Sequence, residues 1–76
     1  MEVKEFLEIV WLSEEKVTIE KRKEWVELRY NDNMLDFRHG WIDVYLIQWD
    51  NDTLLFNLEY DKKNLIDILK KILQLN

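Results

Sequence analysis

Hydrophobic and polar residues alternate with the two-residue period of β-strands in the centre of the chain, over the stretch WIDVYLIQWDNDTLLFNLEY (residues 41–60). Two runs rich in β-branched and aromatic residues are separated there by the polar cluster Asp50-Asn51-Asp52. This pattern predicts a β-hairpin. The second face of the hairpin is not properly polar, so the hairpin has more apolar surface than a single buried face requires.

The length of the hairpin loop decides which residues share a face, and neither short loop has the Gly that its preferred turn usually contains. A two-residue loop, residues 51–52, would place Asp43 on the most apolar face, where an unpaired carboxylate is costly. We therefore predict a three-residue loop, residues 50–52. One face is then aliphatic and holds Ile42, Val44, Leu46, Leu54, Phe56, Leu58 and Tyr60. The other face is mixed and holds Trp41, Asp43, Tyr45, Ile47 and Trp49 with Thr53, Leu55, Asn57 and Glu59.

Short runs before residue 40 extend this pattern into an antiparallel meander. Residues 17–22 and 25–30 each alternate as strands do, and the charged residues between them form an exposed connection. The run 34–38 follows the turn signal Asn31-Asp32-Asn33. His39-Gly40, with the only Gly of the chain, supplies the next reversal.

Residues 5–12, EFLEIVWL, fit two patterns. As a strand, Leu7, Ile9 and Trp11 share one face. As a helix, Phe6, Leu7, Val10 and Trp11 continue a stripe that begins at Val3. We predict a strand because Ile, Val and Trp favour β-structure and the following Glu residues suit a short turn.

The C-terminal segment has the clearest helical pattern. Asp61 is a suitable N-cap, and Lys70 and Lys71 lie near the C-terminal end, where the helix dipole favours cations. The apolar positions at helical spacing are Leu65, Ile68, Leu69, Ile72 and Leu75. The predicted fold class is α+β: an antiparallel β-meander of five or six short strands with a C-terminal amphipathic helix packed on one face, in one domain of residues 1–76.

Composition narrows the class of protein. The chain has 76 residues with 47% hydrophobic residues, which is typical of a globular domain. It has no Cys, so disulfides, thiolate nucleophiles and zinc–cysteine sites are excluded. Its apolar runs are too short to span a bilayer and no secretion signal is present, so we expect a cytoplasmic location without membrane contact. The absence of Ala and Pro is typical of an AT-rich bacterial, archaeal or viral genome.

No motif indicates an enzyme, a cofactor or a metal. A metal or acid–base cluster could be formed by Asp36, His39 and Asp43, but a transition-metal site usually contains more His or Cys residues. The cluster at residues 50–52 lacks the Gly and the later ligands of a calcium loop. We expect no catalytic residues, and a domain of this size seldom encloses a pocket of the ~300 Å³ that substrates favour.

The run Lys21-Arg22-Lys23 followed by Trp25 resembles a small nucleic-acid patch, with cations for phosphate and an aromatic ring for stacking. The net charge of the chain is −5, from sixteen acidic and eleven basic residues. Since phosphate neutralisation needs an excess of Lys and Arg, a solvated hairpin connection is the better interpretation of this run.

Four tryptophans are many for this length, and Trp is a leading anchor residue of protein interfaces. The main hypothesis is therefore a small acidic protein-binding module, an inhibitor of the phage or plasmid anti-defence or immunity type that occupies a partner's basic surface, with mimicry of nucleic-acid phosphates as a sub-case. The residues expected to contact the partner are Trp41, Asp43, Tyr45, Trp49, Asp50, Asp52, Asn57 and Glu59. The alternative for the mixed face, which a small chain in need of core favours, is that the N-terminal strands curl over it and bury it in a barrel or sandwich. The alternatives are a homo-oligomeric structural protein, assembled through edge strands or the C-terminal helix, and a nucleic-acid binder that uses Lys21, Arg22, Lys23 and Trp25.

Overall fold

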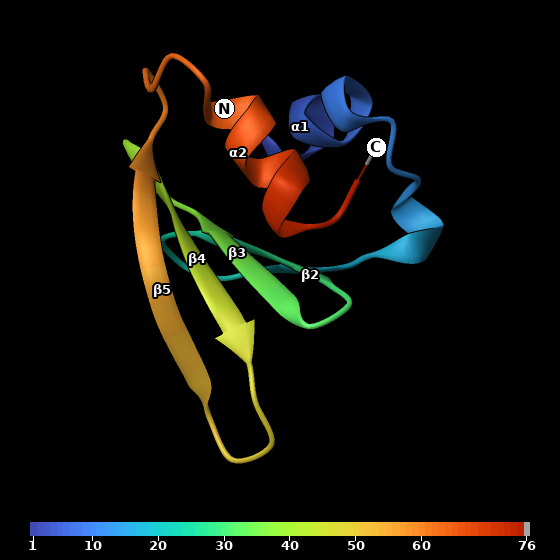
Figure 1. Ribbon diagram of the computed structural model, residues 1–76, viewed down its shortest axis with the longest axis vertical. Coiled ribbons are helices and arrows are strands. Elements are labelled where there is room, and N and C mark those ends of the chain that lie inside the picture. Colours follow the sequence, from blue (N-terminus) through green and yellow to red (C-terminus); the bar gives the residue numbers. More distant parts are fainter. Residues whose placement is uncertain (76) are drawn as a thin grey trace.

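The computed structural model describes residues 1–75 and consists of one antiparallel sheet with two helices on one side (Figure 1). The elements in chain order are α1 (Val3–Val10), the 3₁₀-helix η1 (Glu14–Lys16), β1 (Thr18–Lys21), β2 (Val26–Tyr30), β3 (Asn33–Phe37), β4 (Trp41–Ile47), β5 (Asp52–Glu59) and α2 (Leu65–Ile72). The strands lie in the order β1-β2-β3-β4-β5, each antiparallel to the next. The predicted α+β meander with a C-terminal helix is confirmed, and the meander has five strands.

Short turns keep the strands in register. Asn31 adopts a left-handed backbone conformation, with φ 52°, in the turn between β2 and β3. Asn tolerates this conformation better than most residues. Beyond the ends of the strands, the N–H of Arg22 donates to the carbonyl of Trp25 and the N–H of Arg38 donates to the carbonyl of Trp41, each at 2.8 Å. The sheet pairing therefore continues into both connections.

The strand predicted for residues 5–12 is wrong, because this segment forms helix α1. The helical stripe decides the outcome: Val3, Phe6, Leu7 and Val10 are all buried against the sheet and α2. The gain from burying this stripe exceeds the preference of Ile, Val and Trp for extended backbone. The helix ends at Val10, and the next residue, Trp11, has a left-handed backbone with φ 60°.

The core lies between the helices and the face of the sheet that they cover. It combines side chains of α1 and α2 with alternating residues of the strands. The largest fully buried side chains are Phe6, Leu28, Leu35, Ile42, Val44 and Leu69. The rings of Phe6 and Phe37 are 5.5 Å apart between centroids and inclined by 55°, a favourable geometry for two aromatic rings.

Helix α2 is shorter than the sequence predicted. It begins after Asn64, not after Asp61, and its eight residues extend over about 12 Å. Leu65, Leu69 and Leu73 are buried, so the predicted packing on the sheet holds. A helix of this length covers only the part of the β4–β5 hairpin near its base.

The three-residue loop predicted at residues 50–52 is wrong. Strand β4 ends at Ile47, and the N–H of Gln48 donates to the carbonyl of Asn51 at 3.0 Å, so Trp49 and Asp50 form the tip of the hairpin. A β-bulge then leaves Leu55 without a partner, because Val44 pairs with Phe56 and Tyr45 with Leu54. Below the bulge, Ile42 and Val44 therefore share a face with Phe56 and Leu58, as predicted. Without a Gly, no sequence signal located the turn.

Candidate functional site

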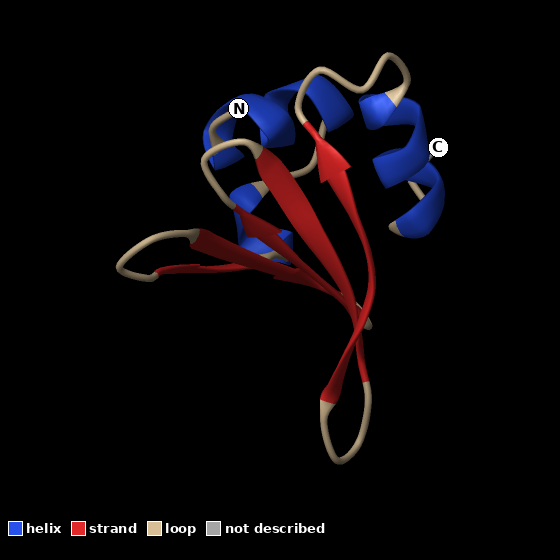
Figure 2. Ribbon diagram, turned by 90° about the vertical axis from the view of Figure 1, so that its left-hand side faces the viewer, coloured by secondary structure: helices blue, strands red, loops and turns tan. Residues whose placement is uncertain are grey.

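The half of the β4–β5 hairpin beyond the bulge, residues 45–56, is called the distal hairpin below. It projects past both helices, as the two perpendicular views show (Figures 1 and 2). Trp49 at its tip is 99% exposed. Leu54, Leu55 and Phe56 on β5 are exposed as well. A group of large apolar side chains outside the core of a small protein is typical of a binding surface.

The outer edge of the distal hairpin is also unpaired. Strand β5 is the last strand of the sheet among the described residues and, at eight residues, the longest. An exposed edge strand presents a row of backbone N–H and C=O groups to which another strand can bind. The opposite edge, β1, has only four residues and includes Glu20 and Lys21. A short, charged edge is a usual protection against such pairing, whereas β5 is twice as long and has its two charged residues, Asp52 and Glu59, only at its ends.

The face of the sheet opposite the helices, called the open face below, has a row of carboxylates across four strands. The pairing places Glu20 opposite Glu27, Glu27 opposite Asp36, Asp36 opposite Asp43, and Asp43 opposite Asn57. Glu27, Asp36 and Asp43 are buried although no helix lies over them. Like charges on directly opposite residues destabilise a sheet, so this row requires compensating cations.

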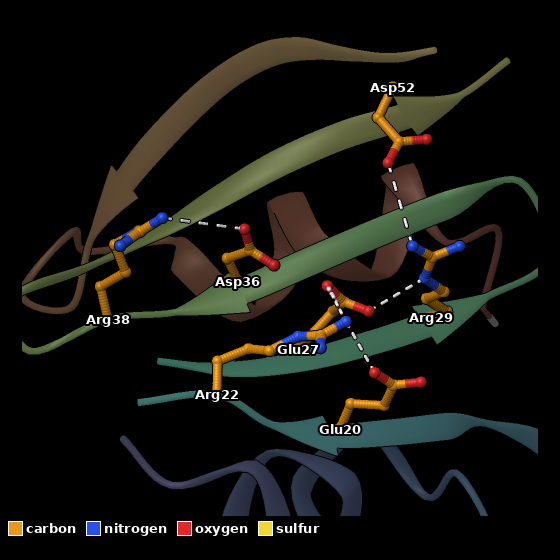
Figure 3. A network of polar contacts seen from close by, with 7 residues as sticks. All are labelled: Glu20, Arg22, Glu27, Arg29, Asp36, Arg38 and Asp52. Carbon is orange, nitrogen blue, oxygen red and sulfur yellow. Dashed lines mark hydrogen bonds and ion pairs between the residues drawn. The ribbon is translucent and has the colours of Figure 1, made fainter. Parts of the chain in front are cut away.

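Two arginines compensate the first half of this row (Figure 3). Arg29 Nε donates to Glu27 Oε2 at 3.0 Å, and its Nη2 lies 3.9 Å from Asp52 Oδ2. Arg22 Nη2 lies 2.6 Å from Glu20 Oε2 and 3.7 Å from Glu27 Oε1. Glu27 is thus held between two guanidinium groups.

Arg38 and Trp41 compensate the second half. Arg38 Nε donates to Asp43 Oδ2 and Trp41 Nε1 donates to Asp43 Oδ1, both at 2.8 Å. The guanidinium of Arg38 also lies 4.4 Å from the ring centroid of Trp25, a cation–π contact. Both oxygens of Asp43 are therefore engaged within the protein.

Asp36 is the least compensated carboxylate of the row. Its Oδ2 lies 4.0 Å from Arg38 Nη2, and its Oδ1 has no hydrogen-bond partner among residues 1–75. Burial, reinforced by the neighbouring charges of Glu27 and Asp43, raises the pKa of Asp36 from 3.8 to about 6. Burial and the same carboxylate row raise the pKa of Tyr45 as well. The open face therefore carries a group that titrates just below neutral pH.

The residues predicted to contact a partner fall into three groups. Trp49, Asp50 and Asp52 lie at or beside the tip of the distal hairpin and are exposed. Asp43 is buried in the polar network and Tyr45 is half-buried. The remaining three residues, Trp41, Asn57 and Glu59, lie on the open face near the base of the hairpin and are exposed. The structure therefore does not bring all eight together in one patch.

Two features of this surface were not predicted from the sequence. The apolar residues Leu54 and Phe56, which the sequence analysis placed on the aliphatic face of the hairpin, are exposed because α2 is too short to reach them. The carboxylate row was not anticipated, since it becomes visible only when every turn position is known. The only sign of the row in the sequence is that Glu27 and Asp36, and likewise Asp36 and Asp43, lie at equal distances on the two sides of a turn.

The second tryptophan that is almost fully exposed, Trp11, lies at the end of α1 and is 93% exposed. Ile9 is the exposed large apolar residue closest to it in sequence.

Within residues 1–75, no group of three or more His, Cys, Asp or Glu is arranged to hold a metal, and His39 is exposed in the turn between β3 and β4. In the same range no helix is long and apolar enough to cross a membrane.

The fold and this surface define a small α+β domain with a five-stranded meander and a projecting hairpin. No protein-family model, curated protein or solved structure matches the chain. Its function is therefore inferred from its own geometry and chemistry.

Proposed function

We propose that the protein is an acidic protein-binding module that inhibits a partner by occupying a basic surface with its distal hairpin. The observation that carries the proposal is the exposure of Trp49 at the tip, next to an unpaired edge strand with exposed Leu54, Leu55 and Phe56. Large aromatic residues supply most of the binding energy of many interfaces when a pocket in the partner desolvates them. An edge strand adds backbone hydrogen bonds that do not depend on the partner's sequence.

Electrostatic attraction to the partner comes from the loops of the hairpin and from the net charge. Asp50 is exposed beside Trp49, while Asp52 is exposed near Arg29 at 3.9 Å. The net charge of −5 favours encounter with a basic surface at low ionic strength. Asp43 takes no part in this attraction because its two oxygens accept hydrogen bonds from Arg38 and Trp41.

The test compares two variants with the same substitution. Trp49→Asn and Trp11→Asn each remove one nearly fully exposed indole, but only Trp49 belongs to the distal hairpin. Wild type and both variants are used for affinity capture from the source cell or its host, and candidate partners are then purified and titrated by calorimetry. We expect Trp49→Asn to weaken binding at least about 30-fold, which corresponds to the 2 kcal/mol of an interface anchor, and Trp11→Asn to leave it unchanged.

Repeating the titration between 50 and 500 mM salt tests the charge of the partner. Affinity should fall as salt screens the acidic loops. Equal binding by wild type and Trp49→Asn would refute the hairpin as the contact surface, and an affinity independent of salt would refute the basic partner.

The unpaired edge also favours a second candidate, a homodimer in which the β5 strands of two copies pair. Sedimentation equilibrium separates the two functions. A monomer at high concentration would remove the homodimer. A dimer that Leu55→Lys dissociates would favour it over the inhibitor.

A further inference from the structure

A cleft of about 680 Å³ opens on the side of the molecule away from the distal hairpin, between the start of α1, the β1–β2 connection and the β3–β4 turn. This volume lies within the range of small-molecule sites, ~300–1,000 Å³, and exceeds the expectation for a domain of this size. Its wall includes the apolar side chains of Val3, Ile19, Val26 and Phe37. The cleft uses none of the residues of the distal hairpin, so an inference from it is independent of the proposed function.

The rim of the cleft is basic in an acidic protein. Five of the chain's eleven Lys and Arg residues line it, but only two of its sixteen acidic residues, Glu2 and Glu24, do so. Lys4, Lys21 and Lys23 form no ion pair with any residue in 1–75. The other two cations are paired with carboxylates outside the cleft. Three uncommitted ammonium groups are thus gathered beside an apolar wall.

The residues of the wall favour an aliphatic ligand over a planar one. Trp25 offers the widest aromatic surface in the cleft, but the guanidinium of Arg38 lies 4.4 Å from its ring centroid. A nucleobase could not stack on that side of the indole. The other apolar groups are the half-buried Ile19 and Val26 and the small exposed parts of the core residues Val3 and Phe37, and they suit a hydrocarbon chain in van der Waals contact.

We propose that this cleft binds a free small organic anion with an aliphatic chain, the carboxylate or phosphate group at the lysine rim and the chain against the apolar wall. Charge complementarity fixes the orientation: the head group remains near the ammonium groups and the solvent. Burial of the chain supplies the affinity, at about 0.8 kcal/mol for each fully buried methylene.

The probes are sodium octanoate and octyl phosphate, titrated below their micelle-forming concentrations and followed by amide chemical shifts of the ¹⁵N-labelled protein. We expect saturable shifts at Ile19, Val26 and Phe37, and none at Leu54 or Leu55. Acetate lacks the chain and 1-octanol lacks the charge, so each should bind at least about tenfold more weakly than octanoate.

Two double variants with the same change in net charge locate the head group. Lys21→Glu/Lys23→Glu reverses the rim, whereas Lys62→Glu/Lys63→Glu reverses two exposed lysines that do not line this cleft. We expect about a tenfold loss of octanoate affinity for the first pair, and less than a twofold change for the second. Lys21→Gln/Lys23→Gln should give a smaller loss and covers the event that charge reversal impairs folding.

Three results would overturn the proposal: no saturable shift with either probe, equal losses for both lysine pairs, or shifts confined to the distal hairpin. Tighter binding of adenosine monophosphate than of octanoate would overturn the aliphatic assignment in favour of a nucleotide.

Discussion

The two faces of the sheet exclude water by different means. On the covered face, α1 and α2 bury apolar side chains such as Phe6, Leu35 and Leu69. On the open face, carboxylates are buried beside arginines from the strands and their connections, and Asp43 also accepts a hydrogen bond from Trp41. Apolar burial does not depend on ionisation, whereas the stability of the open face depends on the protonation of Asp36. The open face is thus occupied by its own network, and most of the large apolar side chains that remain exposed lie on the distal hairpin.

The largest effect is expected on the covered face. Phe6→Ala removes a fully buried ring that packs against Phe37 and should lower the free energy of unfolding by about 4 kcal/mol. A 76-residue domain has roughly 4–11 kcal/mol of stability in total, so this variant should lose at least about a third of it. Urea denaturation followed by circular dichroism measures the change. Phe6→Leu is the control and should cost less than half as much, with the same loss at pH 5 and pH 8.

On the open face, Arg38→Ala should cost about 3 kcal/mol at pH 8, because it leaves the buried Asp43 without its cation. The loss should be smaller at pH 5. Arg38 also lowers the pKa of Asp36, so its removal increases the cost of ionised Asp36 above pH 6. Denaturation at the two pH values measures this difference. Arg38→Lys retains the charge without the planar contact to Trp25, so its stability should lie between that of the wild type and that of Arg38→Ala. Equal losses for Arg38→Ala at both pH values would contradict the electrostatic account.

Asp36→Asn tests the same face with the opposite sign. The folded-state pKa of about 6 exceeds the ordinary value of 3.8, so the folded protein binds this proton more tightly than the unfolded chain. Stability from this group is complete below pH 4 and is lost as the pH rises through 6. At pH 8 the variant should therefore be more stable than the wild type by about 2 kcal/mol, somewhat less than the full linkage value of about 3 kcal/mol.

Thermal denaturation between pH 4 and pH 8 measures this gain, which should vanish at pH 4. Asp61→Asn makes the same change in net charge at an exposed position and serves as the control. A gain of equal size for Asp61→Asn would attribute the effect to net charge. A loss for Asp36→Asn at pH 8 would show that the ionised carboxylate is stabilised by contacts other than those with Arg38.

The sequence predicted those parts of the fold that depend on local signals. The turn residues Asn31 and Asp32 and the two-residue period of the strands were sufficient for the meander, and helical spacing was sufficient for α2. It failed where tertiary contacts decide. Val3, Phe6, Leu7 and Val10 form a helix because that stripe covers the sheet, although the local composition favours a strand.

Of the candidate site, the sequence indicated only that the hairpin exposes aromatic surface. Surplus aromatic residues in the hairpin indicated an exposed surface, and Trp49 is exposed. Its place at the tip could not be predicted, because the turn has no Gly and the bulge at Leu55 has no sequence signature. The pairing of Asp36 and Asp43 across the open face required the turn positions as well, since a shift of one residue moves every side chain to the other face.

The smallest effect on stability is expected in the distal hairpin, where neither means of excluding water operates. Trp49 is 99% exposed, so Trp49→Asn should change the free energy of unfolding by no more than about 0.5 kcal/mol. Trp41, at the base of β4 and outside the distal hairpin, is the contrast: Trp41→Phe removes the N–H that donates to Asp43 at 2.8 Å and should cost about 1 kcal/mol. Urea denaturation of both variants at pH 7 measures the two changes in the free energy of unfolding. A loss above about 1 kcal/mol for Trp49→Asn would mean that this indole packs against the hairpin in solution, and a packed indole could not serve as a free anchor for a partner.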